Sequence, residues 1–259
     1  MKYLRYFSLA CIIVPAICSC SILTSIQWDP NQLASAVGNM TTAASITDAQ
    51  IVELCRQSTA KLDKENTIET GAYNTRLQKL VKSVNVQGLN LNFKVYKTSE
   101  INAFASADGS VRVYSGLMDV MNDDELIAVI GHEIGHVSLE HVKKSIKSSY
   151  MTAASRDVVN AAGTVGVLSQ TVLGDIAESL VGAQYSQKHE YEADEFGFNF
   201  AIQNGHSPYS MYNALNKLMQ LSSGSQASAV SKMFSSHPDN EKRCQRMKSM
   251  AEKYSTSKK

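Results

Sequence analysis

Apolar residues recur every three or four positions along most of this chain, which is the spacing of an amphipathic helix. The pattern predicts helices at about residues 47–66, 72–86, 123–147, 187–203, 208–221 and 239–254, with a Ser/Gly linker before the last. Two helices begin with recognisable caps, because Thr47 precedes the first and Asn122 stands three residues before Glu125 in the third. We therefore expect a mostly α-helical chain.

The apolar period changes to two between the second and third helices. Residues 91–97 alternate apolar and polar side chains, as a half-buried strand does. Two further extended runs, 101–105 and 111–114, flank the turn-forming pair Asp108-Gly109, which predicts a hairpin. The expected fold is therefore α+β, with a small antiparallel sheet ahead of the helix at 123–147.

The run Asn102, Ala103, Phe104 and Ala105 is a candidate strand for binding a peptide. The edge of a sheet can hold an extended peptide through main-chain hydrogen bonds, whatever its side chains. The same pattern also fits a hairpin that only covers the core. The sequence leaves both roles open for this strand.

The N-terminus has the features of a bacterial lipoprotein signal. Two basic residues precede an apolar stretch at 6–17, which is too short to span a bilayer as a helix. The letters ICSC at 17–20 resemble a lipobox, with cleavage before Cys20 and a lipid on its thiol. Ser21, in place of Asp, resembles the pattern of lipoproteins sorted to the outer membrane. The expected address is the periplasmic face of the outer membrane of a Gram-negative bacterium, and an ordinary cleaved signal peptide is the alternative.

These features divide the chain into three predicted parts. Residues 1–19 form the signal peptide, residues 20–46 the lipidated cysteine and a flexible tether rich in Ser, Thr and Ala, and residues 47–259 one folded domain. An uncharged stretch at 158–174 is rich in Ala and Gly and interrupted by polar residues. It predicts close helix packing, with membrane contact as the alternative.

Composition limits the classes of function. With 259 residues, of which 44% are hydrophobic and 19% charged, the chain is long enough for one sizeable core. Its formal net charge of +1 argues against nucleic-acid binding, because neutralising many phosphates requires an excess of basic residues. After the N-terminal segment is removed, Cys55 and Cys244 remain, and the sequence leaves open whether they form a disulfide.

One pentapeptide in the helix at 123–147 carries candidate chemistry. His132 and His136 stand four residues apart and share a helix face, where both imidazoles can reach one metal ion. Glu133 projects about 100° further round the helix. From there it can act on a water at the metal without being a ligand. The sequence thus predicts two ligands and a general base, and a third ligand from elsewhere.

The continuation of this helix does not supply the third ligand. Glu140 lies on the same ridge, but each step of four residues climbs about 6 Å, which is too far for three ligands of one ion. We expect Glu140 to be solvated or to contact a ligand without binding the metal. His141 is expected to be a surface or packing residue, because a metzincin needs its third histidine one position later, where this chain has Val142.

The better candidate is Glu190, which lies in a later helix and can approach the ion from across a helix pair. Asp194 stands one turn further on, where a carboxylate can accept the free N–H of a ligating histidine. Glu192 points to another side of the helix and is the second candidate for the ligand.

Together these motifs resemble a known family. His-Glu-x-x-His followed by Glu-x-x-Ala-Asp is similar to the gluzincin metallopeptidases that include the heat-shock protease HtpX, the CAAX prenyl proteases and the mitochondrial Oma-type proteases. The stretch ahead of the family's zinc helix is matched by residues 102–105, Gly109, Val113 and Gly116-Leu117. His237-Pro238 with Arg243 matches a His-Pro-x-x-x-x-Arg element near the family's C-terminus. The lipobox and small size are most similar to the LoiP-like periplasmic lipoprotein proteases.

This resemblance implies an enzyme and its cofactor. It implies that the domain at 47–259 is a metallopeptidase that holds one Zn²⁺ ion by His132, His136 and Glu190. The implied activity is endoproteolysis of unfolded or envelope proteins, with a partner protease or the outer-membrane assembly machinery as candidate associates. His237 is implied as an oxyanion donor or as a resting fourth ligand. His189 stands where many relatives carry Arg, and its expected role is structural, with contact to a metal ligand as the alternative.

A second hypothesis is a lipid-anchored outer-membrane assembly factor or chaperone with a structural metal. A structural zinc site is closed by a fourth Cys or His ligand, and the sequence has none at zinc-finger spacing. A structural site also has no need of Glu133 beside its first ligand. The enzyme is therefore the favoured hypothesis.

Overall fold

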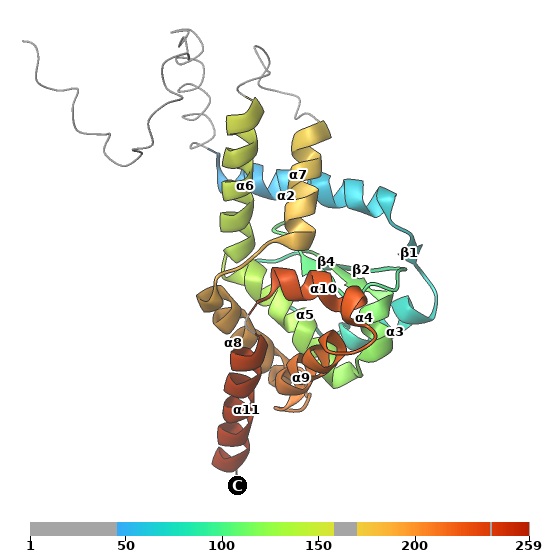
Figure 1. Ribbon diagram of the computed structural model, residues 1–259, viewed down its shortest axis with the longest axis vertical. Helices are drawn as coiled ribbons and strands as arrows, with labels where there is room; N and C mark the ends of the chain where they lie inside the picture. Colours follow the sequence, from blue (N-terminus) through green and yellow to red (C-terminus); the bar gives the residue numbers. More distant parts are fainter. Residues whose placement is uncertain (1–45, 158–169, 239, 259) are drawn as a thin grey trace, which may run out of the picture.

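The computed structural model describes residues 46–157, 170–238 and 240–258, which form helices around a small sheet (Figure 1). No helix in these ranges is long and apolar enough to cross a membrane. The predictions for the signal peptide, for Cys20 and for nearly all of the tether lie outside the described residues, as does most of the stretch at 158–174.

The sheet of the described residues has four strands in the order β1-β2-β4-β3. Their bounds are Ile68–Glu69 for β1, Asn92–Tyr96 for β2, Ala103–Ala105 for β3 and Ser110–Tyr114 for β4. The predicted hairpin is confirmed, because β3 and β4 are antiparallel. The expectation of a wholly antiparallel sheet is wrong. Because β4 inserts between β2 and β3 instead of extending the edge, it runs parallel to β2, and the sheet is mixed.

Strand β3 lies at the edge of this sheet, next to the helix that carries the histidine pair. All three of its residues are buried, and so is Asn102 just before it. Its outer edge pairs with no other strand of the described residues. The position therefore suits the candidate role in peptide binding, and the burial equally suits a cover for the core.

Helix α5 (Asp123–Ser138) crosses the centre of the molecule (Figure 1) and is buried along most of its length. The predicted capping box is present. The Asn122 side chain accepts a hydrogen bond from the Glu125 main-chain N–H at 2.9 Å, and the Glu125 side chain accepts one from the Asn122 N–H at 2.9 Å. These bonds satisfy two of the unpaired N–H groups at the start of the helix.

The prediction that this helix continues to residue 147 is wrong. It ends at Ser138, and Glu140 adopts a left-handed conformation with φ of 62°. A new helix, α6 (His141–Asp157), then starts. The apolar spacing continues through the break, because Val142 and Ile146 are buried in the new helix. Periodicity alone therefore could not reveal the break.

Helix α8 (Gln187–Gln203) packs closely along α5, and glycines make this approach possible. A Cβ atom on Gly197 would lie 2.8 Å from the main-chain oxygen of Ala128 and 3.0 Å from the main-chain nitrogen of His132. A Cβ on Gly135 would lie 2.9 Å from Cβ of Phe196. The absence of side chains at these positions brings the start of α8 beside the histidine pair.

The remaining helices surround this pair. Helices α2 (Asp48–Glu65), α6 and α7 (Gln170–Gly182) pack together, and α9 (Ser210–Ser222) and α11 (Asn240–Ser257) pack on the opposite end, as Figure 1 shows. Helix α3 (Ala72–Leu80) ends earlier than the predicted residue 86. Among the described residues, three helices were not predicted as such: α4 (Ser115–Val120), α10 (Ala227–Ser236) and α7, of which only the first turn overlaps the stretch at 158–174. Helix α10 occupies much of the expected Ser/Gly linker.

The two remaining cysteines are both buried free thiols. Cys55 lies in α2 and Cys244 in α11, at opposite parts of the fold in Figure 1. Burial raises the pKa of the Cys55 thiol to about 11, so the thiolate needed for exchange or metal binding is disfavoured. The disulfide left open by the sequence does not form in this structure.

Candidate metal centre

Four buried side chains from three helices converge on one point. His132 and His136 come from α5, Glu190 from the first turn of α8, and His237 from the C-terminal end of α10. Each offers one ligand atom, and these atoms all lie within 4.8 Å of one another. The fold thus brings together the three residues predicted as ligands, and it adds His237.

The spacing of these atoms fits a zinc ion. Ligands held about 2.0–2.1 Å from a tetrahedral zinc lie about 3.3 Å from one another. Nε2 of His132 is 3.1 Å from Nε2 of His136, and the two nitrogens are 3.6 and 3.4 Å from the oxygens of Glu190. Burial lowers the pKa of His136 well below its usual value, so the ring is in the neutral form that binds a metal.

Glu133 lies next to this cluster without belonging to it. Its side chain is buried, and Oε1 has no hydrogen-bond partner among the described residues. The nearest charged neighbour is His237, whose Nε2 lies 3.5 Å from Oε1. Burial raises the pKa of the Glu133 carboxyl, which makes it a stronger base than an exposed glutamate. A buried carboxylate oxygen without a partner can accept a proton from a water at the metal.

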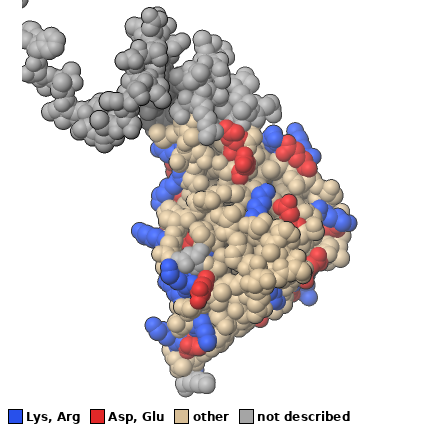
Figure 2. Space-filling model, viewed as in Figure 1, with Lys and Arg blue, Asp and Glu red and all other residues tan. Residues whose placement is uncertain are grey.

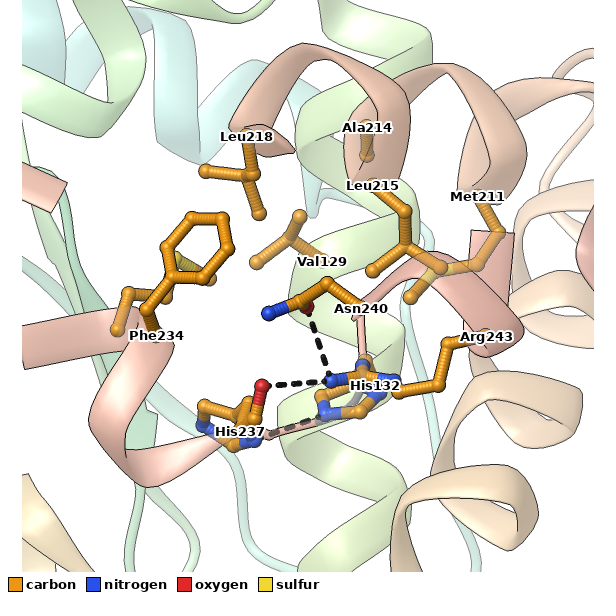
Figure 3. A pocket seen from close by; sticks show the side chains of 11 residues that line it. Val129, His132, Met211, Ala214, Leu215, Leu218, Phe234, His237, Asn240 and Arg243 are labelled. Atoms are coloured by element: carbon orange, nitrogen blue, oxygen red, sulfur yellow. Dashed lines mark hydrogen bonds between the residues drawn. The ribbon is translucent and has the colours of Figure 1, made fainter. Parts of the chain in front are cut away.

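His237 lies between the ligand cluster and Glu133. Its Nδ1 is 3.2 Å from Nε2 of His132 and 3.1 Å from Oε1 of Glu190, and Figure 3 shows it close to His132. Burial acts to lower the pKa of the ring, but the carboxylates of Glu190 and Glu133 outweigh it and raise the pKa. The ring can therefore carry a proton beside the place where a substrate oxygen would become negative.

A buried arginine holds the carboxylates of α8 in place. Arg243 of α11 donates two hydrogen bonds to Asp194, at 2.8 and 2.7 Å, and its Nη1 lies 2.6 Å from Oε2 of Glu190. The same Nη1 donates to the main-chain oxygen of His237 at 3.2 Å (Figure 3). Although burial acts to raise them, Arg243 and the nearby histidines lower the pKa of Glu190 and bring that of Asp194 to about 2. Both carboxylates are therefore charged.

Asp194 also lies beside the first ligand. Its Oδ1 is 2.9 Å from Nδ1 of His132, without the alignment of a hydrogen bond. A small rotation of the imidazole would make this contact a hydrogen bond and fix the tautomer that leaves Nε2 free for the metal. The geometry is consistent with the orienting role expected for Asp194.

His141 is buried, which excludes the surface position expected for it as one alternative and agrees with the other, a packing role. Its side chain is 2% exposed, and its Nδ1 lies 3.1 Å from Nδ1 of His136. On its other side, Nε2 lies 3.1 Å from Oε2 of Glu192. Glu192 therefore faces His141 and lies outside the zinc cluster. Glu140 is exposed, as expected.

Sequence reasoning missed Tyr185, which precedes α8. Its ring stacks on the imidazole of His136, with centroids 3.8 Å apart and an angle of 23° between the planes. Burial raises the pKa of the phenol, so it stays protonated. Nothing in the local sequence indicates this contact, because it depends on how the segment before α8 crosses the end of α5.

An apolar pocket opens beside His132 and His237, as Figure 3 shows. Its walls come from α5, α9 and the C-terminal end of α10, and Asn240 and Arg243 lie near the histidines. The apolar wall consists of Val129, Met211, Ala214, Leu215, Leu218, Met233 and Phe234. The free volume of the pocket is about 10 Å³, about what one water molecule needs, so a side chain could enter only if the surrounding side chains moved.

Comparisons with known proteins agree with this chemistry. The model of the family described as peptidase family M48 matches residues 68–251. The chain is 39% identical over 239 residues to metalloprotease YcaL of Escherichia coli K12, covering 89% of this chain and 92% of that protein. It is 41% identical over 234 residues to metalloprotease LoiP of the same organism, covering 88% and 91%. The beta-barrel assembly-enhancing protease of Yersinia pestis is 30% identical over 157 residues, or 56% of this chain and 32% of that protein.

Proposed function

The chain belongs to peptidase family M48 and is a zinc metalloendopeptidase, and we propose that it cleaves misfolded or envelope proteins as a form of quality control. We further propose that a lipid on Cys20 anchors it to the periplasmic face of the outer membrane. The observation that carries the catalytic proposal is the buried cluster of His132, His136 and Glu190 beside the unpartnered carboxylate oxygen of Glu133.

In this proposal His132, His136 and Glu190 hold the zinc ion. When bound there, zinc acts as a Lewis acid that lowers the pKa of a water and polarises the substrate carbonyl. Glu133 accepts the proton of the attacking water on its free Oε1 and delivers it to the leaving amine. The pKa of this carboxyl is raised by burial, which makes it a stronger base than an exposed glutamate and suits it to accept the proton.

We assign His237 a role at the developing oxyanion. A protonated imidazole beside Glu133 and the ligand cluster can donate a hydrogen bond to a carbonyl oxygen as its charge grows. The same ring lies at the distance of a fourth ligand from His132 and Glu190. In the resting enzyme it would then cover the position that water needs, and substrate binding would displace it.

The substrate is proposed to bind as an extended strand along β3. Residues 102–105 lie at the sheet edge nearest α5, so main-chain hydrogen bonds there would lead a peptide past the zinc cluster. Recognition through the main chain is tolerant of sequence, as a protease of unfolded proteins requires.

The cellular address is proposed from the N-terminal sequence. The lipobox-like residues 17–20 support lipidation of Cys20, and Ser21 supports the outer membrane. The relative from Yersinia pestis is named for β-barrel assembly, which is a process of the outer membrane. The outer-membrane assembly machinery is therefore proposed as a partner, with another protease as the alternative.

A comparison of cleavage products tests this function. Envelope proteins are collected from a deletion strain that carries either the wild-type gene or Glu133→Gln, and new protein N-termini are identified by mass spectrometry. The proposal expects N-termini that depend on Glu133 and that lie mainly in envelope proteins. Identical sets of N-termini from the two strains would contradict it.

The same strains separate the enzyme from a lipid-anchored assembly factor or chaperone. An enzyme with Glu133→Gln is expected to leave the envelope defect of the deletion strain uncorrected. If Glu133→Gln restored the envelope as fully as the wild type, binding would be the function and proteolysis incidental.

A further inference from the structure

A second group of potential metal ligands lies beside the zinc cluster and takes no part in the catalytic scheme. His141 at the start of α6, together with His189 and Glu192 of α8, offers ligand atoms that all lie within 4.8 Å of one another. We propose that these three residues form a second site for a divalent transition metal such as Zn²⁺, and that its occupation inhibits the enzyme.

The donor set and its spacing support a metal. Two imidazoles and one carboxylate are the donors of the catalytic cluster too, and they leave a fourth position for water. Nε2 of His141 lies 3.1 Å from Oε2 of Glu192, close to the 3.3 Å or so expected between ligands of tetrahedral zinc. The second imidazole is near, because the rings of His141 and His189 stack with centroids 4.1 Å apart and 17° between their planes. The nitrogen lone pairs lie in the ring planes, so one of the rings would have to rotate for both to bind one ion.

Hydrogen bonding alone does not account for the whole cluster. A hydrogen bond from His141 to Glu192 explains those two side chains. Among the described residues, however, the ring nitrogens of His189 have no hydrogen-bond partner, although the ring is half-buried against His141. A metal that binds His189 would give this ring a polar partner.

An ion can reach this site from solvent. His141 forms its buried floor, while the side chain of Glu192 is 41% exposed. Lys188 forms an ion pair with Glu192, with Nζ 3.7 Å from Oε1, and the charge of Lys144 also acts on His141. Lys188 is 81% exposed, so this ion pair is weak and a metal can displace it.

The second site is joined to the zinc centre through His136. Nδ1 of His141 lies 3.1 Å from Nδ1 of His136, so one of the two nitrogens must carry the shared proton. With its Nε2 on a zinc ion, His136 would carry its proton on Nδ1 and would donate it in a hydrogen bond to His141. A metal on Nε2 of His141 would put a proton on that Nδ1 as well, and two N–H groups would then face each other. Occupation of the second site therefore weakens the hold of His136 on the catalytic zinc, and the coupling is reciprocal.

The test counts the metal ions bound to the full chain. The protein carries Glu133→Gln to prevent self-cleavage, and it is dialysed against increasing free Zn²⁺ before elemental analysis. We expect a first equivalent of zinc and then, at higher concentration, a second. Adding His189→Asn is expected to remove the second equivalent and keep the first. His206→Asn is the matched control and keeps both, because His206 pairs with Asp124 at the other end of α5.

Protease activity at increasing free Zn²⁺ provides a second measurement. The wild-type protease is expected to lose activity over the range of free Zn²⁺ in which the second equivalent binds, whereas His189→Asn should require roughly tenfold more zinc or higher. The second site would be ruled out if the Glu133→Gln protein bound only one equivalent of zinc. It would also be ruled out if adding His206→Asn removed the second equivalent as His189→Asn does. Equal sensitivity of the wild type and His189→Asn would overturn the inhibition. The count of bound ions does not depend on which protein is cleaved, so it can fail or succeed independently of the proposed function.

Discussion

Arg243 is the residue that balances the negative charges of the Asp194 and Glu190 carboxylates in the zinc centre. Its guanidinium is 2% exposed and contacts the carboxylates of Asp194 and Glu190 and the main-chain oxygen of His237. Burial of the two carboxylates without this cation would be strongly unfavourable. Arg243 therefore both stabilises the fold and positions a zinc ligand, although it touches no metal.

Replacement of Arg243 by Ala is expected to lower the free energy of unfolding by about 3–5 kcal/mol, because it leaves buried charge unpaired. Urea denaturation followed by circular dichroism measures this loss. Arg246→Ala is the control, since Arg246 also joins α11 to α8 but its ion pair with Glu195 is partly exposed, and a loss of about 1 kcal/mol or less is expected. Equal losses for the two variants would contradict the role of Arg243.

At the scale of residues, the sequence predicts those site residues whose relative positions are fixed by one helix. His132, Glu133 and His136 could be assigned because helical spacing fixes their relative directions, and Glu190 and Asp194 because they share one face of α8. His141 and Tyr185 could not, because both reach His136 from separate segments. The break at Glu140 turns His141 back towards the site, and no local pattern indicates that turn.

At the scale of elements, the site depends on the close packing of α5 against α8. Gly197→Ala would bring a Cβ within 2.8 Å of the Ala128 main-chain oxygen and 3.0 Å of the His132 nitrogen. Main-chain atoms cannot rotate away, so α8 must shift and carry Glu190 with it. We expect a loss of about 1–3 kcal/mol in stability and weaker zinc binding, measured by competition with a chelator. Gly174→Ala is the control, because its Cβ would meet nothing within 4 Å. Unchanged zinc affinity in Gly197→Ala would contradict this view.

Helix α2 is fastened to the sheet by one carboxylate, Asp63. It accepts hydrogen bonds from Arg112, Lys94 and Tyr96 at 2.6–3.0 Å. Although burial acts to raise it, the pKa of Asp63 is lowered by Arg112, Lys94 and Tyr96. A lowered pKa in the folded state stabilises the protein at pH values above the unfolded value of about 3.9. This stabilisation is lost as the pH falls through the lower folded pKa.

Asp63→Asn tests this linkage. At pH 7 the variant is expected to be less stable by about 3 kcal/mol, because Arg112 is then buried without its partner. Below about pH 4 the difference from the wild type should shrink, since the wild-type carboxyl becomes protonated as well. Urea denaturation across this pH range measures it, and a difference that did not vary with pH would contradict the assignment.

Helices are predicted best where a capping residue coincides with the start of the apolar helical spacing. Thr47 and Asn122 mark true helix starts because their capping boxes are local. The parallel pairing of β2 and β4 was missed, because strand order is decided by the path of the chain and not by alternation. Helix α10 was missed because its short run of Ser and Ala resembles a linker, although Val230 and Met233 anchor it in the core. Its end presents His237 to the site.

At the scale of the whole molecule, charge gives little guidance to a substrate. Figure 2 shows basic and acidic side chains interspersed on the visible face, in keeping with the net charge of +1. Long-range steering of a charged partner requires a field of one sign. Selection of substrates therefore depends on what reaches the site, and the proposed membrane anchor would decide which proteins do.

The anchor is tested by Cys20→Ser. The variant is expected to lose the lipid and to appear in the soluble periplasmic fraction, whereas the wild type sediments with the outer membrane. Cys18→Ser is the matched control, because Cys18 lies in the segment that the predicted cleavage removes. Membrane association of Cys20→Ser equal to that of the wild type would contradict lipidation at this residue.

The most direct test of the central claim measures bound zinc and cleavage of an unfolded protein on one preparation each of the wild type and Glu133→Gln. Because Glu133 is the base and not a ligand, the variant is expected to keep its zinc while the rate of cleavage falls by about 10²–10⁴-fold. Glu195→Gln, an exposed carboxylate on α8, should retain both. If Glu133→Gln kept its zinc and cleaved the protein at the wild-type rate, the account would be contradicted.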